Sequence, residues 1–574
     1  MFQPNQPGQG PDIKNLIIAL VLCTAIMGAW QYFYERPRLE AQRIAAEKNA
    51  LVETVKAPVV DTKVEAVETT ETDDAPRLPI RSNALHGTIN LKGARFDDLT
   101  LANYHETLEK GSPEVRLLNE RSSKAPYFAE FGVLPAEAHI AAPDGNSLWQ
   151  SGGRSLSPEH PVTLEWQSGG LKYEKTIHMD EHYMFTVTLT VHNDTGEALT
   201  FFPYGLVNRT FADTSKHMYI LHEGPLGVLG NELKEISYES LRDDGPTKLE
   251  DTKGWLGITD KYWLSAIVPD KGEVFDASFR HITRDDKDAY QIDARGESFT
   301  VDAGKSHSVT MRLFAGAKKV ELLDQYASEY NIPLFDRAVD FGMLYFLTRP
   351  MFELLTFFQS HVGNFGIAIL LLTVTIKLIM FPLANKSYTS MSQMKLLTPK
   401  MMEIREKFAD DKMKMNQEIM EMYKREKVNP LSGCLPILIQ IPVFFALYKV
   451  LFVTIEMRHA PFYGWIHDLS AMDPTNLFTL FGLVPWDAPS FLHLGALPII
   501  MCATMVLQQK LNPKPTDEVQ AMVIGYMPYI FLFLFATFPA GLVLYWAWNN
   551  TLSIAQQWFI QRRLEKKGLR PKNA

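Results

Sequence analysis

The sequence predicts a multi-domain membrane protein, with six α-helical spans and a large antiparallel β-sandwich outside the membrane. Three observations support this prediction. Apolar runs near the N-terminus and after residue 364 are long enough to cross a bilayer. Between them, residues from about 80 to 330 alternate apolar and polar side chains with the period of two that strands show. Loops rich in lysine and arginine alternate with loops that nearly lack them.

Composition excludes several classes of protein. The 574 residues carry a formal net charge of −9, which is not typical of a nucleic-acid-binding chain, so no specific DNA partner is expected. The three cysteines, Cys23, Cys434 and Cys502, all lie in or beside apolar runs. The soluble part therefore has neither a disulfide framework nor a Cys-x-x-Cys zinc ligand pair. We expect no metal site and no cofactor.

The N-terminal segment 1–35 contains the first span, residues 15–34 ("NLIIALVLCTAIMGAWQYFY"). A cleaved signal peptide is the alternative, but the run is long for one and no small-x-small site follows it. A lipoprotein at Cys23 would require a small residue where Leu22 stands. We therefore predict an uncleaved signal anchor. The next segment, 36–79, is predicted to be a tether. Residues 37–55 predict a short polar helix that continues from the anchor, whereas residues 56–76 are acidic, rich in Thr and Pro and without periodicity, which predicts disorder.

Residues 80–330 are predicted to form the β-sandwich. In "HYMFTVTLTVHNDTG", apolar side chains fall on one face of a strand, the residues between them fall on the other, and a turn sequence follows. "VTLEWQSGGLKYEKTIHM" predicts a hairpin around Gly169 and Gly170. Short strands of this kind, separated by turns over the whole segment, indicate a large antiparallel sandwich. Its histidines and carboxylates show no spacing that isolates a catalytic set, so its role is not predicted.

Helices are expected to form the rest of the chain. Residues 331–363 mix apolar stripes with sparse charges, which predicts an amphipathic helix lying in the membrane interface. Residues 364–561 are expected to form a five-span core, and a basic tail, 562–574, follows. The five spans are expected at about 365–383, 433–455, 491–509, 522–537 and 541–560. Pro539 and Gly541 separate the last two, because they disfavour a continuous helix.

Charge sets the expected orientation of the spans. Lysine and arginine number ten in loop 384–430 and six in the tail, whereas loop 456–490 has only Arg458. The positive-inside rule then requires six spans in all, with both termini and loop 384–430 in the cytoplasm. Residues 36–350 lie outside, which for a bacterial inner membrane means the periplasm.

Lys377 is the one charge between Phe365 and Leu383, where a lysine costs about 2.5–3.5 kcal/mol on insertion scales. It lies near the cytoplasmic end of its span, so snorkelling is one interpretation. A shared polar cavity is the other, because several spans contribute polar side chains. These are Thr373, Gln440, Asn549, Asn550, Thr551, Ser553, Gln556 and Gln557. Lys449, near the outer end of the third span, is expected to snorkel.

Acidic residues are absent from the predicted spans, whereas proton- or ion-coupled transporters usually carry intramembrane carboxylates. No redox, phosphate-binding or nucleophile motif accompanies Lys377, so we predict no catalytic residue and no enzyme. A cation in a wet cavity open to the cytoplasm would instead attract acidic or polar segments.

Loop 384–430 predicts two amphipathic helices joined at 409–412, with Asp410 and Asp411 at the tip of a cytoplasmic hairpin. Its eight methionines either fill the seam of the hairpin or form an adaptable surface for apolar partners. The basic excess favours anionic lipid head groups or an RNA-containing partner such as the ribosome.

The stretches "NPLSGCLPILIQIPVFFALYKVL", "PFYGWIHDLSAMDP" and "FPAGLVLYW" closely resemble the YidC/Oxa1/Alb3 family of membrane protein insertases. The order of elements is similar to the Gram-negative type throughout: anchor, periplasmic sandwich, interfacial helix, five-span core and cytoplasmic hairpin. The resemblance implies a protein that inserts and folds nascent inner-membrane proteins, alone or beside the Sec translocon. It also implies that the hairpin and tail meet the ribosome or the signal-recognition machinery.

The resemblance further implies a hydrophilic groove in the inner leaflet, open to cytoplasm and lipid. Lys377 stands where the family usually has arginine, which keeps the charge but loses the planar fork. Thr373 matches a groove position, and Gln440, Asn549, Asn550 and Gln556 are expected to complete the polar lining. The substrate-contact slide of the family corresponds to Ile441, Phe444, Tyr545 and Trp546 in this chain.

The alternative function is a small-solute transporter or channel, in which the periplasmic sandwich captures a ligand. That protein would give solute flux in liposomes, whereas an insertase would make a small two-span protein protease-protected there.

Overall fold

The computed structural model describes residues 75–210, 221–284, 287–426, 435–484, 493–512 and 518–566. The predicted anchor, 1–35, lies outside these residues, as does most of the predicted tether. The tether boundary at residue 79 is wrong, because the first strand, β1, already begins at Arg77. Arg77, Leu78 and Pro79 pair with the neighbouring strand β2 and belong to the sandwich.

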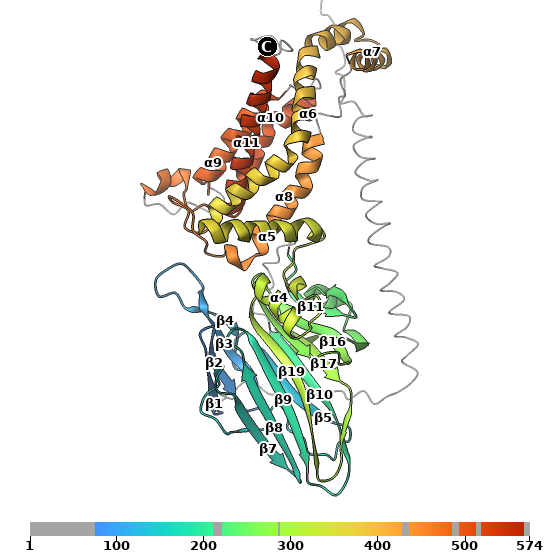
Figure 1. The fold of residues 1–574 in the computed structure, drawn as a ribbon, viewed down its shortest axis with the longest axis vertical. Coiled ribbons are helices and arrows are strands. Elements are labelled where there is room, and N and C mark those ends of the chain that lie inside the picture. Colours follow the sequence, from blue (N-terminus) through green and yellow to red (C-terminus); the bar gives the residue numbers. More distant parts are fainter. Residues whose placement is uncertain are drawn as a thin grey trace, which may run out of the picture. The chain divides into compact units, whose positions relative to one another are not determined.

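Two antiparallel sheets form the part of the chain between Arg77 and Ala317 (Figure 1). The first sheet contains β1 (Arg77–Arg81), β2 (Leu85–Asn90), β3 (Arg95–His105), β4 (Glu114–Leu118), β5 (Tyr127–Pro135), β10 (Leu199–Thr210), β13 (Thr247–Thr252), β16 (Phe275–Arg284), β17 (Lys287–Gly296) and β18 (Phe299–Val301). The second contains β6 (Gln150–Ser151), β7 (Val162–Ser168), β8 (Leu171–Met179), β9 (Met184–Asn193), β11 (Gly224–Leu229), β12 (Glu232–Glu235), β14 (Gly254–Thr259), β15 (Trp263–Pro269) and β19 (Lys305–Ala317). A short helix, α3 (Tyr238–Asp243), joins β12 to β13.

Alternation along β9 shows why these residues form a sandwich. Phe185, Val187, Leu189 and Val191 are buried between the sheets. Thr188, on the other face, hydrogen-bonds with Thr310 of the paired strand β19. The predicted hairpin is confirmed, since β7 and β8 meet at two glycines with left-handed φ angles of 60° and 82°.

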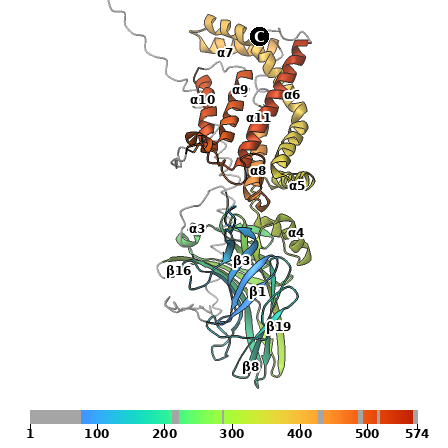
Figure 2. The same cartoon turned by 90° about the vertical axis from the view of Figure 1, so that its left-hand side faces the viewer.

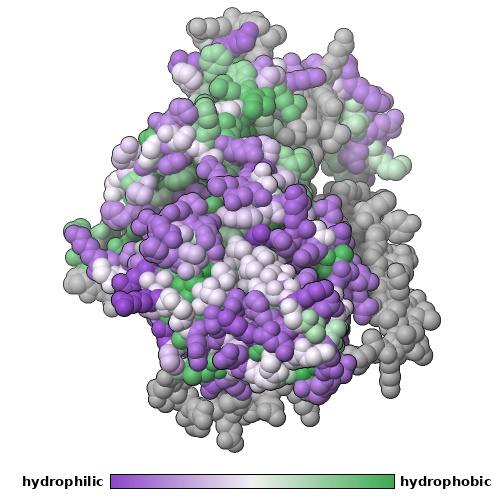
Figure 3. Space-filling model, turned by 60° about the horizontal axis from the view of Figure 1, so that its bottom comes forward, coloured by the Kyte–Doolittle hydropathy of each residue, from purple (hydrophilic) through white to green (hydrophobic). Residues whose placement is uncertain are grey.

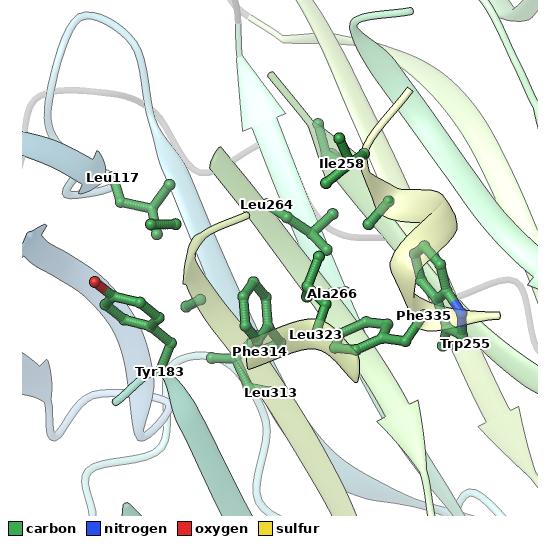
Figure 4. Packing of buried hydrophobic residues seen from close by; sticks show 14 of the residues in the cluster. Leu117, Tyr183, Trp255, Ile258, Leu264, Ala266, Leu313, Phe314, Leu323 and Phe335 are labelled. Carbon is green, nitrogen blue, oxygen red and sulfur yellow. The ribbon is translucent and has the colours of Figure 1, made fainter. Parts of the chain in front are cut away.

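A helix closes one part of the apolar core. Figure 4 shows Leu323 of α4 (Val320–Glu329) beside Phe314 of β19, with Phe335 and Trp255 next to them. The ring centroids of Phe314 and Phe335 are 5.4 Å apart, and those of Trp255 and Phe335 are 5.2 Å apart. The surface seen in Figure 3 is mostly hydrophilic, with scattered apolar residues.

Seven helices follow α4 among the described residues. They are α5 (Tyr345–Val362), α6 (Phe365–Lys407), α7 (Lys412–Arg425), α8 (Leu435–Val453), α9 (Ala496–Leu511), α10 (Glu518–Phe535) and α11 (Ala540–Lys566). One helix of the described chain is long and apolar enough by itself to span a membrane, over Phe365–Ser390. Shorter apolar helices cover Gln440–Val453, Ala496–Leu511 and Ala521–Phe535. The predicted break near Pro539 is confirmed, because α10 and α11 are separate helices.

Two predicted boundaries are corrected. The amphipathic helix occupies Tyr345–Val362 and not all of 331–363, because a short 3-10 helix and an extended segment come first. This helix, α5, runs across the base of the helical part in Figure 1, is seen nearly end-on in Figure 2, and packs against α6 and α8. The hairpin does not begin at residue 384, because α6 continues without a break from the span through Pro382 and Pro399 to Lys407.

The expectation that Lys449 snorkels is wrong. Its ammonium donates a hydrogen bond to the carboxylate Oδ2 of Asp340, with an Nζ–Oδ2 distance of 2.7 Å. The same carboxylate accepts from the backbone N–H groups of His222 and Gly342. Asp340 thus connects α8 to the segment before α5 and to the loop before β11. The sequence could not show this pairing, since the two charges are 109 residues apart.

Candidate functional site

Lys377 lies half-buried on α6, facing α11. Its Nζ donates a hydrogen bond to Oγ of Ser553, at 2.9 Å. The Ser553 hydroxyl in turn donates to the backbone carbonyl of Asn549, one helical turn earlier, also at 2.9 Å. The indole N–H of Trp548 donates to the carbonyl of Leu370, which holds α11 against α6 at this level. The lysine is therefore fixed by contacts between two helices.

No carboxylate that the structure describes forms an ion pair with Lys377. An ammonium carries three donors, and Ser553 is its one hydrogen-bond acceptor among the described side chains and backbone groups. A buried, unpaired charge is costly in a medium of low dielectric, whereas water can solvate the remaining donors. An ammonium with a single protein acceptor would therefore need access to water for its remaining donors.

Two further polar side chains complete what we call the Lys377 cluster, consisting of Lys377, Tyr388, Ser553 and Gln557. The hydroxyl of Tyr388 lies near the side chains of Ser553 and Gln557. The side-chain amide of Gln557 donates to Asn512, just after α9, at 3.1 Å. The Lys377 cluster thus joins α6, α11 and the end of α9 on the side of the bundle where the hairpin begins.

The predicted polar lining is divided among several places. Thr373 is only 2% exposed, and its hydroxyl donates to the carbonyl of Ile369 in its own helix. Gln440 donates to the hydroxyl of Tyr545 at 2.9 Å, and Asn550 donates to Thr504 of α9 at 3.2 Å. Asn549 and Gln556 are half-buried, and Nε2 of Gln556 has no hydrogen-bond partner among the described atoms. Asn549 is hydrogen-bonded to the Lys377 cluster, because its backbone carbonyl accepts from Ser553.

The predicted slide is brought together in part. The rings of Phe444 on α8 and Trp546 on α11 meet edge to face, with centroids 4.7 Å apart. Ile441 is 47% exposed beside them, one turn earlier on α8. Tyr545 is buried and points toward Gln440 instead of outward. The exposed apolar surface between α8 and α11 therefore depends on Ile441, Phe444 and Trp546.

Sequence reasoning missed Tyr388 and Thr504. Tyr388 is eleven residues after Lys377, which is close to three turns of one helix, so both share a face of α6. That signal was available only if the helix continues past residue 384. Thr504 carries no signal in the sequence, because a single threonine on an apolar helix usually bonds its own backbone.

The hairpin is formed by the end of α6 and by α7. Leu397 and Met401 of α6 pack on Met422 of α7, and Lys400 pairs with Glu426 at 3.1 Å. The turn contains Asp410 and Asp411, as predicted, and the Asp411 carboxylate caps α7 by accepting from the N–H of Lys414. The methionines fall into two groups, of which the buried one fits the interpretation that they fill the seam. Met401 and Met422 are buried in the seam, whereas Met402, Met413 and Met420 are exposed.

Comparisons with known proteins cover both parts of the chain. Residues 357–567 match the family described as 60Kd inner membrane protein, and residues 77–354 match the family described as YidC periplasmic domain. The membrane protein insertase YidC of Rickettsia conorii is 47% identical over 555 residues, which cover 96% of this chain and 99% of the relative. The corresponding protein of Rickettsia canadensis is 48% identical with the same coverage.

One solved structure is an active YidC insertase whose first transmembrane domain is resolved. It is 19% identical, covers 84% of this chain and 95% of its own, and superposes with a TM-score of 0.35.

Proposed function

The chain belongs to the YidC family of membrane protein insertases, and from this premise we propose that it inserts nascent proteins into the bacterial inner membrane through a hydrophilic groove at the Lys377 cluster. The insertase function rests on relatives that match almost the full length of the chain. Insertion is a physical transfer between solvents, so no covalent step and no cofactor are required. The groove and the residues that line it are the proposed part.

The observation that carries the groove is the Lys377–Ser553 hydrogen bond in the absence of a described carboxylate partner. Water must reach the ammonium if it is to stay charged, and a hydrated ammonium can solvate the polar or acidic flank of an incoming chain. Translocation of that flank would then begin at the groove, partway through the bilayer. Less hydrocarbon remains to be crossed, so the free-energy barrier is lower.

The short length of α9 is consistent with a thin hydrocarbon layer beside the groove. The 16 residues of α9 rise ~24 Å, compared with ~30 Å for a typical hydrocarbon core. The apolar part of the nascent chain would leave along Ile441, Phe444 and Trp546 into lipid. Hydrophobic transfer drives that step, and the membrane potential assists translocation of an acidic flank.

The proposed topology has six spans: the segment 1–35 and the five within 364–561. Both termini and the hairpin lie in the cytoplasm, and residues 36–350, with the sandwich at 80–330, lie in the periplasm. Family membership gives an inner-membrane protein with a periplasmic domain. The excess of lysine and arginine in the hairpin and tail supports the orientation.

The hairpin is proposed to receive partners from the cytoplasm. Its exposed methionines, Met402, Met413 and Met420, suit apolar segments of varied shape, and its positive charge suits the ribosome and anionic lipids. The signal-recognition machinery and the Sec translocon are the further partners that we propose.

The groove is tested by replacing Lys377 in proteoliposomes that insert two matched substrates, one with an acidic and one with a neutral translocated tail. For Lys377→Ala, we expect insertion of the acidic substrate to fall about tenfold, and Lys377→Arg to remain active, because only the charge is needed. Lys386→Ala is the matched control, since Lys386 is an exposed lysine of the same helix. An equal loss for both substrates would contradict the groove.

The transporter alternative is tested with the same vesicles. Solute flux without protease protection of a two-span substrate would favour a transporter. The comparisons do not support that function, because both relatives described above are insertases.

A further inference from the structure

An exposed apolar turn lies between α8 and α9. Residues 477–484, which we call the apolar turn, contain six large apolar side chains, each between 38% and 84% exposed. They are Leu477, Phe478, Leu480, Phe481, Leu483 and Val484. An apolar patch of this density on a soluble surface marks a contact with something apolar.

Buried polar side chains hold the apolar turn in place. The Oδ1 atom of Asn476, which is buried, accepts from the backbone N–H groups of Phe478 at 3.1 Å and Leu494 at 3.3 Å. Asp473, also buried, accepts from Thr475 and from the N–H of Leu497 at 2.7 Å. The turn is therefore attached to the start of α9.

The backbone of the apolar turn is unusual. Leu480 and Phe481 both adopt left-handed φ angles, of 48° and 58°, which large side chains rarely do. Hydrogen bonds from the N–H of Phe481 to the carbonyl of Asn476 and from Val484 to Thr479 keep this conformation. The result directs apolar side chains outward, at a conformational cost that a contact must offset.

Composition and position indicate what that contact is. No charged residue occurs from Pro474 to Val484, so the turn offers a protein partner no ion pair. Tyr463 and Trp465, exposed in the same connection, are the residue types that gather at membrane interfaces. Helix α9, which follows this connection, also exposes the apolar side chains Ile500 and Leu507. A contact with lipid acyl chains would account for the lack of charge, for the exposed aromatic residues and for the exposed apolar side chains of α9.

We propose that the apolar turn inserts into the acyl-chain region of the outer leaflet and anchors the connection between α8 and α9 there. The placement in the outer leaflet rests on the proposed topology. The anchor itself rests on the exposed side chains and on the polar contacts that fix the backbone.

The test is the depth of a fluorescent label in liposomes that contain the full chain. The environment-sensitive dye NBD is attached to Leu483→Cys after the three native cysteines have been replaced by serine. We expect blue-shifted emission and at least twofold stronger quenching by doxyl-labelled phosphatidylcholine than for Leu108→Cys. Leu108 is the matched control, because it is an equally apolar, 54% exposed residue of a sandwich loop.

A third label, at Leu507→Cys on α9, tests the proposed membrane span separately from the proposed insertion of the apolar turn. If the label at 483 is exposed to water while the label at 507 is quenched by lipid, the proposed membrane insertion of the apolar turn is wrong, whereas the proposed span that contains α9 still holds. If both are wet, the proposed spans fail as well. A label at 483 that is dry but not quenched by lipid would show that protein covers the turn, and the proposal would be abandoned.

Discussion

Ser553 is the residue that most directly fixes the position of the Lys377 ammonium. Its hydroxyl accepts from the ammonium and donates to Asn549, so it fixes where the charge points. Hydrogen bonds to charged groups contribute about 1.5–3 kcal/mol.

Replacing Ser553 with alanine should therefore weaken insertion of a substrate with an acidic tail. We expect a two- to fivefold loss in proteoliposomes, smaller than for Lys377→Ala, because water can take over the lost bond. Thr551→Ala is the control, since that hydroxyl bonds only the carbonyl of Ala547 in its own helix. Identical rates for Ser553→Ala and the wild type would show that the contact does not position the charge.

Glu456, in the 3-10 turn after α8, gives a prediction for pH. Burial raises its pKa from 4.5 to about 7, and Oε2 has no hydrogen-bond partner among the described atoms. The groups around it are Lys319, Glu321 and the N–H of Val320. The folded state therefore holds this proton more tightly than the unfolded state does. The contribution of Glu456 to the free energy of unfolding is fully present below pH 4.5, and this contribution is lost as the pH rises through about 7.

Thermal unfolding in detergent at pH 5.5 and pH 8 measures this effect. Glu456→Gln should gain up to about 3 kcal/mol relative to the wild type at the higher pH. Glu321→Gln, a change at an exposed neighbour, should leave the pH dependence intact. Parallel curves for the wild type and Glu456→Gln would contradict the assignment.

Single residues show what the sequence could and could not predict. Lys377 and Ser553 stood out because polar side chains in an apolar run are rare. The pairing of Lys449 with Asp340 was not predictable, since nothing local connects the two positions. The inward direction of Tyr545 was missed for the same reason, because it depends on Gln440 of another helix.

At the scale of elements, Gly366 sets how closely α6 meets the connection after α8. A Cβ atom at this position would lie 2.0 Å from Cδ2 of Phe462, so any side chain must displace the ring. The glycine is thus required by a close approach and not by its φ angle.

Gly366→Ala should lower the free energy of unfolding by about 1–3 kcal/mol, as overpacking does. Gly525→Ala in α10 is the matched control, because no atom beyond the neighbouring backbone of its own helix lies within 4 Å of the added Cβ. The better helix propensity of alanine should make this change neutral or stabilising. The measurement is thermal unfolding of both variants. Equal melting temperatures would mean that Phe462 yields without cost.

Helix boundaries were the least predictable feature of the elements. The second span was expected to end at about residue 383, yet α6 continues through Pro382 to Lys407. A proline removes one backbone hydrogen bond and need not end a helix whose other contacts persist. The turn at 409–412 was predictable, because Asp411 is a residue type that caps helices.

At the scale of the whole molecule, the sandwich was predictable as a class but not as a topology. Period two indicated strands and turns indicated antiparallel pairing. The sheets nevertheless pair β5 with β10 and β9 with β19, which are far apart in the chain. Such order depends on packing between sheets, and local sequence does not encode it.

The slide predicts where a nascent chain leaves the protein. A photocrosslinking residue at Ile441 should capture a ribosome-stalled membrane segment, because this side chain is exposed next to Phe444 and Trp546. Ile500 on α9 is the matched control, with almost the same exposure of 45%. Capture at 500 but not at 441 would place the exit elsewhere.

Water at Lys377 is the assumption common to the whole mechanism, and it can be measured on the native residue. Inside-out and right-side-out membrane vesicles are treated with a small, membrane-impermeant amine reagent, and modification of each lysine is read by mass spectrometry. We predict that Lys377 reacts from the cytoplasmic face only, and more slowly than the exposed Lys386. Reaction of Lys386 with none at Lys377 from either face would contradict it.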